Sequence, residues 1–358
     1  MMKRSRVITG LDIGSSNICA IQAEHDERGS MNVLGFARVP SRGVRRGYIV
    51  DLDGATAAIT NAIDRLREKT LKKPTPIWVS VGNQSVSAQE SQGMIRLSMR
   101  GREITESDVK KCVDAAGTIK LPFHRDLMHR IVQSYYVDDD VEVQNPVGLY
   151  GSRLGAKIVA VTASVPHLQN IQKAVNNAGY ETAEFVYSGI AEGAALLSDS
   201  DKKRSVALID IGSSTTEISI FTGGTLYSLE IIPLGGSDIK GALADDDNFI
   251  TLQSAVVRSL DRVRKQRGMV EKILLAGGAT LVDNVVERLE SAVSIPVSIG
   301  EARGVVGNIR GHEKAISAAS LGLVRYVFDR RSAPAAAKFQ NPLKRVSAGI
   351  ADIFSRYF

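Results

Sequence analysis

The fold is decided by a pentapeptide, DIGSS, that occurs at residues 12–16 and again at 210–214. An apolar run precedes each copy, and a β-rich segment follows it, NICAIQA at 17–23 and TTEISIFTGG at 215–224. Short apolar runs bounded by Gly and Ser are typical of strands joined by tight turns. The two stretches therefore predict two β-hairpins of the same kind.

The repeat continues beyond the two hairpins. Each is followed by a third strand, an amphipathic helix and a closing strand. The predicted third strands are 33–40 and 226–234, the helices about 54–69 and 252–266, and the closing strands 77–82 and 272–278. Two copies of one such unit predict an α/β protein with two similar lobes and a cleft between them.

Residues 83–160 have no counterpart in the second copy, and they predict an α+β subdomain inserted into the first lobe. Its helix, 105–119, starts at Thr105 and has Asp108 three residues on, which favours a capped start. The other predicted elements are strands 85–97, 129–137, 155–163 and 182–187 and helices 166–179, 189–198 and 313–328. The last helix is assigned to the end of the second lobe.

The composition is that of a soluble globular protein, with 44% hydrophobic and 23% charged residues among 358. No run of 18 apolar residues predicts a membrane-spanning helix, and the basic N-terminus lacks the apolar core of a signal peptide. Two cysteines are too few for a disulfide framework. Five of the six net positive charges lie in residues 330–358, so the nearly neutral body is not expected to bind nucleic acid.

An Asp-x-Gly-Ser-Ser turn suits a phosphate group. Its backbone N–H groups and hydroxyls can donate hydrogen bonds to phosphate oxygens, and its carboxylate can hold Mg²⁺. One such turn is more often a plain tight turn, but two that face one cleft could hold a triphosphate from both sides. A third Gly-rich turn, AGGATLV at 276–282, could approach an adenosine, or could simply join a strand to a helix.

These motifs resemble the actin/Hsp70 ATPase superfamily and, within it, the bacterial cell division family FtsA. The resemblance is carried by GLDIGSSN (10–17), PSRGVRRGYIVD (40–51), ESQGMIRLS (90–98), REITESDV (102–109), NPVGLYGSRLGAK (145–157), DIGSSTTEISIFTGG (210–224), LAGGATLV (275–282) and AISAASLGL (315–323). It implies an actin-like (ribonuclease H-like) two-lobe fold with an inserted α+β subdomain in the first lobe and a reduced second lobe. The implied parts are a first lobe (1–82 and 161–203), the inserted subdomain (83–160), a second lobe (204–328), a linker (329–340) and a membrane-targeting helix (341–358).

The resemblance also implies a site for ATP and Mg²⁺. Its implied nucleotide-binding residues are Asp12, Gly14, Ser15, Ser16, Asp210, Gly212, Ser213, Ser214, Thr215, Gly235, Gly236, Gly277 and Gly278. Asp12 and Asp210 would hold the metal. Glu192 is the nearest candidate for a catalytic residue that positions water, although a solvated place on its helix is the favoured expectation.

Three departures from the family pattern predict weak nucleotide binding and at most a weak ATPase. Residues 237–271 leave room for one helix only, so the subdomain that forms a wall of the adenine pocket in relatives is missing, and less of the base would be buried. The second motif reads GSS where many relatives have GGG or GGT. Asn17 stands where many have Lys, which removes a countercharge for phosphate.

The C-terminal residues predict an amphipathic helix that begins at the Asn341 cap, with Pro342 at its first position. At about 100° per residue, its apolar side chains lie within an arc of about 140°. The residues expected to contact an anionic membrane are Leu343, Lys344, Arg345, Val346, Ile350, Ile353, Phe354, Arg356, Tyr357 and Phe358. The alternative is a terminal helix packed on the body of the protein.

The function implied by the resemblance is that of a cell division adaptor. Such a protein tethers FtsZ filaments to the cytoplasmic face of the membrane at the division site, helps to recruit division proteins, self-associates into filaments and uses its ATP cleft structurally. Two alternatives remain open from the residues: a PilM-like actin-related scaffold of a membrane-associated pilus or secretion machine, and a genuine ATPase or sugar-kinase relative.

Overall fold

The computed structural model describes residues 7–25, 30–74, 76–119, 121–138, 141–239, 246–281, 284–307 and 317–332. These residues form two compact units, which we describe separately. Unit 1 contains the described residues up to Ser87 and from Ser164 to Arg331, and unit 2 contains Ala88–Ala163. The amphipathic helix predicted at 341–358 lies outside the described residues, as does most of the predicted linker.

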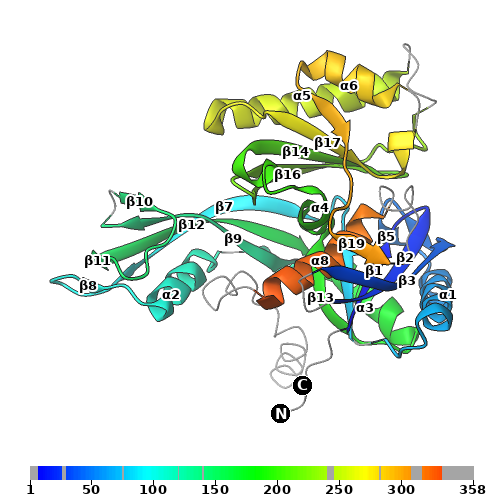
Figure 1. Ribbon diagram of the computed structural model, residues 1–358, viewed down its shortest axis with the longest axis horizontal. Coiled ribbons are helices and arrows are strands. Elements are labelled where there is room, and N and C mark those ends of the chain that lie inside the picture. Colours follow the sequence, from blue (N-terminus) through cyan, green and yellow to red (C-terminus); the bar gives the residue numbers. More distant parts are fainter. Residues whose placement is uncertain are drawn as a thin grey trace. The chain divides into compact units, whose positions relative to one another are not determined.

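Unit 1 consists of two sheets and the helices that cover them (Figure 1). Its strands are β1 (Val7–Ile13), β2 (Asn17–His25), β3 (Met31–Pro40), β4 (Val44–Arg45), β5 (Tyr48–Ile49), β6 (Ile77–Val81), β13 (Thr182–Tyr187), β14 (Ser205–Ile211), β15 (Thr216–Thr222), β16 (Thr225–Ile232), β17 (Lys272–Ala276), β18 (Val297–Ile299) and β19 (Val305–Gly307). Its helices are α1 (Leu52–Thr70), α3 (Val165–Asn177), α4 (Ser188–Leu196), α5 (Asp247–Arg267), α6 (Val285–Val293) and α8 (Ala318–Ser332), with 3₁₀ turns at Asp201–Lys203 and Gly278–Leu281.

The first sheet has the strand order β13-β6-β1-β2-β3-β19. Strands β1, β2 and β3 form an antiparallel meander, and β6 and β13 continue the sheet in parallel with β1. Helix α1 connects the meander to β6. It begins at Asp51, whose side chain accepts hydrogen bonds from the backbone N–H groups of Asp53 and Gly54, and it buries Ile59 and Ile63.

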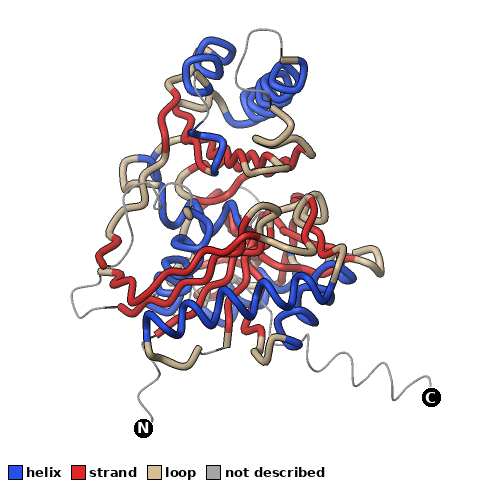
Figure 2. Tube along the Cα trace, turned by 90° about the vertical axis from the view of Figure 1, so that its right-hand side faces the viewer, coloured by secondary structure: helices blue, strands red, loops and turns tan. Residues whose placement is uncertain are grey.

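The second sheet, β16-β15-β14-β17-β18, repeats this arrangement. The first three strands are again an antiparallel meander, and β17 and β18 are again parallel to β14. Helices α5 and α6 lie together on one side of the sheet, at the top of Figures 1 and 2. Phe249 and Leu252 of α5 pack there with Ile209 and Ile218 in one apolar core. The two sheets thus share the topology that the sequence repeat predicts, and the actin-like two-lobe fold is confirmed.

After the second sheet, the chain returns to the first. Strand β19 pairs in parallel with the edge strand β3, with Val305 opposite Met31. Leu321 and Val324 of α8 pack in one core with Ile8 of β1. The sequence predicts that this helix ends the second lobe, but its apolar side chains are buried against the first sheet. It also extends to Ser332, beyond the predicted end at 328, so residues 329–332 are helical and not part of the predicted linker.

Helix α8 is held on the first sheet by polar contacts as well as by its core. Arg330 Nη1 donates hydrogen bonds to both carboxylate oxygens of Glu184, each at 2.7 Å. The guanidinium of Arg331 lies 5.6 Å from the centre of the Trp78 ring. Trp78 of β6 is partly buried against this core. Residues 308–316, where the helix was predicted to begin, lie outside the described residues.

Unit 2 is a four-stranded sheet of order β10-β9-β12-β7 with one helix and a two-stranded ribbon, β11-β8. Its elements are β7 (Ser87–Arg96), β8 (Arg102–Glu103), α2 (Glu106–Ala116), β9 (Arg125–Val137), β10 (Val141–Val143), β11 (Tyr150–Gly151) and β12 (Arg153–Ser164). The predicted capping box is confirmed, since Thr105 and Asp108 exchange side-chain-to-backbone hydrogen bonds. In the part of the chain that the structure describes, no helix has the length and hydropathy needed to cross a lipid bilayer.

Candidate functional site

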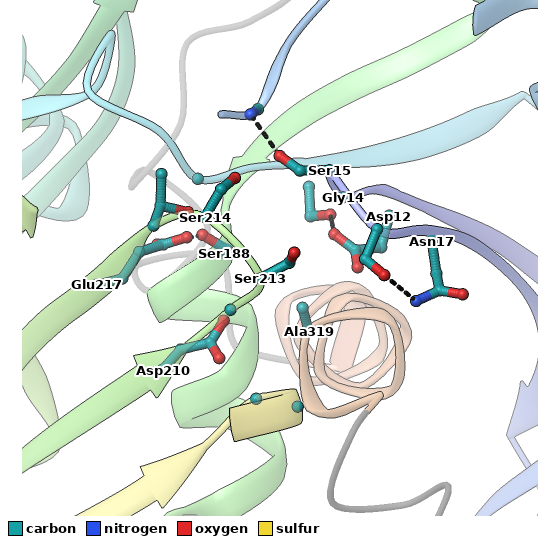
Figure 3. A pocket seen from close by; sticks show the side chains of 18 of the residues that line it. Asp12, Gly14, Ser15, Asn17, Ser188, Asp210, Ser213, Ser214, Glu217 and Ala319 are labelled. Carbon is teal, nitrogen blue, oxygen red and sulfur yellow. Dashed lines mark hydrogen bonds between the residues drawn. The ribbon is translucent and has the colours of Figure 1, made fainter. Parts of the chain in front are cut away.

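A cavity of about 460 Å³ lies in unit 1 where the β1–β2 and β14–β15 turns meet. Figure 3 shows Asp12, Ser15 and Asn17 on one side of it and Asp210, Ser214 and Glu217 on the other. The sequence-predicted residues that line the cavity are Asp12, Gly14, Ser15, Ser16, Glu192, Asp210, Gly212, Ser213, Ser214, Thr215, Gly236, Gly277 and Gly278. Gly235 does not line it; a Cβ at that position would lie 2.5 Å from the Ser214 nitrogen, so Gly235 lets the chain pass closely behind the second turn.

The first turn is held by both backbone and side-chain contacts, and the Ser41 N–H donates to Ser16 O at 2.9 Å. Its own bond runs from Gly14 N–H to Asn17 O, at 3.0 Å. The Gly47 N–H donates to Ser15 Oγ at 2.9 Å, and the carbonyl of Gly47 accepts from Asn83 Nδ2 at 2.9 Å. Asn83 is buried, and its amide nitrogen also lies 3.0 Å from His167 Nε2. Burial lowers the pKa of His167 to about 4, so the neutral ring can accept this hydrogen bond.

The second turn is held mainly by backbone. Gly212 N–H donates to Thr215 O at 3.0 Å, the same bond that closes the first turn. The following segment adds bonds from Gly236 N–H to Gly212 O at 2.8 Å and from Ser237 N–H to Ser213 O at 2.7 Å. Backbone bonds do not depend on side-chain identity, so we expect the loss of one side-chain hydrogen bond to matter less at this turn than at the first.

Each turn follows a strand whose last residue but one is an aspartate, and both aspartates are in environments that favour the protonated form. Ser80 Oγ donates to Asp12 Oδ1 at 2.5 Å. Burial raises the pKa of Asp12, although the Ser80 bond opposes the rise. Burial likewise raises the pKa of Asp210 to about 6; a hydrogen bond from Glu192 opposes this rise and the charge of Asp12 adds to it.

Asp210 Oδ1 is buried and has no hydrogen-bond partner among the described residues. The third Gly-rich turn passes directly beside it, because a Cβ on Gly277, which has φ of 88°, would overlap this oxygen. An unpaired buried carboxylate oxygen is costly unless a cation or donor reaches it. The site therefore fits a ligand that brings positive charge.

Glu192 is not a solvated helix residue, contrary to the favoured expectation. Its side chain is 2% exposed, and α4 directs it into the cavity. Burial, and next the charges of Asp210 and Glu217, raise its pKa well above the ordinary value. The expectation was wrong because α4 lies against both sheets, so it has no solvent-facing side at this position.

Glu217 was not identified from the sequence. It is 6% exposed, lines the cavity and accepts a short hydrogen bond from Ser188 Oγ. Burial and the charge of Asp210 raise its pKa to about 8. The available signal was its place on β15: it lies opposite Asp210 in the β14–β15 register, on the same face as that residue.

The start of α4 joins the two sheets at the base of the cavity. Tyr187 Oη and Ser219 Oγ are 2.8 Å apart, and Ser188 reaches Glu217. Gly82, at the end of β6, approaches so closely that a Cβ there would overlap Glu217 Oε1. The two lobes are thus in direct contact below the cavity.

The described residues contain no group of three or more His, Cys, Asp or Glu side chains arranged to hold a metal ion directly. Asp12 and Asp210 could therefore hold a cation through bound water rather than as a complete set of direct ligands. The hydroxyl and N–H groups of the two turns could contact an anion beside it.

Comparison with known proteins supports the interpretation of unit 2 as an inserted subdomain and of the chain as FtsA-like. A family model described as "SHS2 domain inserted in FTSA" matches residues 83–162. Cell division protein FtsA of Pseudomonas aeruginosa is 30% identical over 243 residues, which are 68% of this chain but 58% of that protein. Cell division protein FtsA of Borreliella burgdorferi is 27% identical over 397 aligned residues, 96% of this chain and 94% of that protein. Since the second alignment is longer than this chain, that relative has residues without a counterpart here.

Among solved structures, the chain resembles one titled "PilM-PilN type IV pilus biogenesis complex", with a TM-score of 0.65. The sequence identity is 15%, and the match covers 88% of this chain and 97% of that one. A likeness at this identity concerns the fold alone.

Proposed function

Because the chain belongs to the FtsA family of bacterial cell division proteins, within the actin-like superfamily, we propose that it is an adaptor of the division machinery. It tethers FtsZ filaments to the cytoplasmic face of the cell membrane at the division site and helps to recruit other division proteins. The observation that carries the proposal is the pair of matched Asp-x-Gly-Ser-Ser turns around one cavity, in a chain whose inserted segment matches the FtsA domain.

ATP with Mg²⁺ is the proposed ligand of the cavity. The turn hydroxyls and N–H groups bind the phosphates from both lobes, and Asp12 and Asp210 hold the cation through water. When bound, Mg²⁺ supplies positive charge among carboxylates that otherwise repel one another. Since residues of both lobes line the cavity, a bound nucleotide stabilises one relative placement of the lobes and so favours self-association into filaments.

Hydrolysis is proposed to be weak. A general base must be unprotonated at the working pH, whereas the pKa of Glu192 is raised well above its ordinary value and that of Glu217 is about 8. Glu217 therefore largely retains its proton at neutral pH until a cation enters, and the pKa of Glu192 is shifted in the same direction. Among the described residues between β16 and β17, α5 is the one helix, and the short interval 237–271 leaves no room for the extra subdomain, so adenine is held loosely.

The membrane contact is proposed to lie in residues 341–358, through the apolar and basic side chains predicted from the sequence. A helix of this length is too short to be stable alone in water but can bury its apolar face at a lipid surface. Deletion of 341–358, or the substitution Phe354→Glu, removes that binding energy. The body of the protein remains intact because those residues follow the last described helix.

Co-sedimentation tests the adaptor proposal. The full-length protein is expected to bring FtsZ filaments down with vesicles that contain anionic lipid, and the protein lacking 341–358 is expected to leave FtsZ in the supernatant. Titration calorimetry with ATP and Mg²⁺ is expected to give binding in the micromolar range or weaker, with little phosphate release. Sedimentation of the truncated protein with vesicles would contradict the membrane contact, and tight binding with steady turnover would favour an ATPase.

A further inference from the structure

One row of side chains crosses the first sheet at the edge of the cavity. Asp12 of β1 lies opposite Ser80 of β6 on one side and opposite Cys19 of β2 on the other. Cys19 in turn lies opposite Arg38 of β3. Residues opposite one another on neighbouring strands point to the same face, and all four line the cavity. The row therefore places Arg38 two strands, or roughly 10 Å, from Asp12.

The charges around the cavity are unbalanced. Its lining contains four carboxylic acids, Asp12, Glu192, Asp210 and Glu217. Arg38 is the one Lys or Arg among the described residues that line it. A polyphosphate carries several negative charges, so each of these acids that loses its proton repels it. The ligand proposed above thus needs positive charge from the protein as well as from its cation.

Arg38 is available for this purpose. Its side chain is exposed, and within the described ranges it forms no ion pair. The neighbouring Asn17 is neutral; it lies opposite Pro40, on the same face as Cys19 and diagonal to Arg38. The first turn itself contains no basic residue at positions 12–17. Among the described residues that line the cavity, the countercharge on this side therefore comes from Arg38 of β3.

We propose that Arg38 is a phosphate-binding residue of this cavity, which supplies from β3 the positive charge that the first turn lacks. The inference rests on the proposed nucleotide-binding function and adds a residue to it. A guanidinium presents several donors in a fixed fork that matches phosphate oxygens, and it keeps its charge at every relevant pH. The polyphosphate then bridges Arg38, the turn at Gly14–Ser16 and the second turn.

The test compares ligands that differ in phosphate number. Titration calorimetry on the full-length protein measures binding of ATP, ADP and adenosine, each with Mg²⁺. Arg38→Gln is expected to weaken ATP binding about tenfold, the lower end of what a charged hydrogen bond contributes. ADP binding weakens less and adenosine binding does not change. Arg38→Lys keeps the charge and is expected to keep ATP affinity within about threefold.

Two further variants separate a phosphate contact from general effects. Arg42→Gln removes the same charge from a nearby exposed residue that does not line the cavity, and it is expected to change ATP affinity little. Asn17→Lys in the Arg38→Gln background puts a cation back on the same face and is expected to recover most of the lost affinity. Circular dichroism of each variant should match the parent, because all three side chains are at the surface or partly exposed.

The outcomes are distinguishable. If the parent protein binds ATP but Arg38→Gln binds it equally well, the inference about Arg38 is wrong and the proposed function stands. Equal losses for ATP and adenosine, or no recovery with Asn17→Lys, would also overturn it, since the residue would then act on the pocket as a whole. If the parent protein binds no nucleotide at all, the proposed nucleotide function fails, and the inference fails with it.

Discussion

The five strands of the second sheet follow the same order as their counterparts in the first, yet the side chains beside the two aspartates differ. In the first sheet the row reads Ser80, Asp12, Cys19 and Arg38 across β6, β1, β2 and β3. In the second the equivalent row, on β17, β14, β15 and β16, reads Ala276, Asp210, Glu217 and Ile231. Thus Asp12 has a hydroxyl donor and a distant arginine in its row, while Asp210 has a second acid beside it and an oxygen with no hydrogen-bond partner in the described part of the chain.

This difference indicates that the side chains that determine ligand binding can change while the repeated backbone fold stays the same. Strand order and turn geometry are the same because both turns need only Gly and a short polar sequence. The neighbouring positions are free to vary, and they place an arginine in the row of the first sheet and a second acid in the row of the second. The predictions below test the comparison in order of expected effect.

The largest effect on stability should come from helix α8, which packs on the first sheet although it follows the second sheet in the sequence. Leu321 of α8 is fully buried with Ile8 and Ile21. Leu321→Ala is expected to lower the free energy of unfolding by about 3 kcal/mol, through lost transfer energy and the cavity left behind. Urea denaturation measures this. Leu71→Ala, at a side chain that is 90% exposed, is the control and should change stability by less than about 0.5 kcal/mol.

The stability of the protein should depend on pH because of Asp210 and Glu217 in the second sheet. The folded-state pKa of Asp210 is raised to about 6 and that of Glu217 to about 8, so the folded protein holds these protons more tightly than the unfolded chain. The stability that these two acids contribute is therefore fully present below pH ~4, the ordinary range of their pKa, and is lost progressively as the pH rises to about 8. The thermal midpoint of the ligand-free protein should be higher at pH 6 than at pH 8.

Glu217→Gln identifies the source of that pH effect. The amide cannot ionise and can keep a hydrogen bond with Ser188, so the fall in thermal midpoint between pH 6 and pH 8 should shrink markedly. Cys19→Ser, at the equivalent position of the first sheet, adds no acid and should leave the pH dependence as in the parent protein. A profile that is flat in the parent, or unchanged in Glu217→Gln, would contradict the assignment.

A smaller effect should distinguish how the two turns are held. Asn83→Ala removes the buried amide that binds the Gly47 carbonyl, so the support of Ser15 is lost. The expected cost is about 1–2 kcal/mol in stability, because a buried acceptor is left unsatisfied. Weaker ATP binding should accompany it.

Ser237→Ala is the matched change at the second turn. It removes one side-chain bond to the Ser213 carbonyl, but the backbone bond to the same oxygen remains. Its effect on unfolding and on ATP binding should be within about 0.5 kcal/mol. Equal effects of the two substitutions would show that the turns do not differ in their support.

The site was only partly predictable. Twelve of the thirteen residues assigned to nucleotide binding line the cavity, because a motif of Gly and Ser after an apolar strand fixes both the turn and its position at the strand end. Glu192 was named, but a solvated position was favoured for it. A helical residue between small neighbours, in SGIAEGAA, has no sequence signal that shows what packs around the helix. Glu217 and Arg38 were missed for the same reason, since only strand pairing places them beside Asp210 and Cys19.

The sequence by itself determined the two-lobe architecture, since its repeat of hairpin, helix and closing strand recurs with the same apolar periodicity in both halves. Those are local properties, set by residues near one another in the chain. Only the tertiary structure decided that α8 and β19 belong to the first sheet, that four acids converge, and that one arginine faces them. These depend on contacts between residues distant in sequence, and burial, which sets the pKa of Glu192 and Glu217, exists only once those contacts have formed.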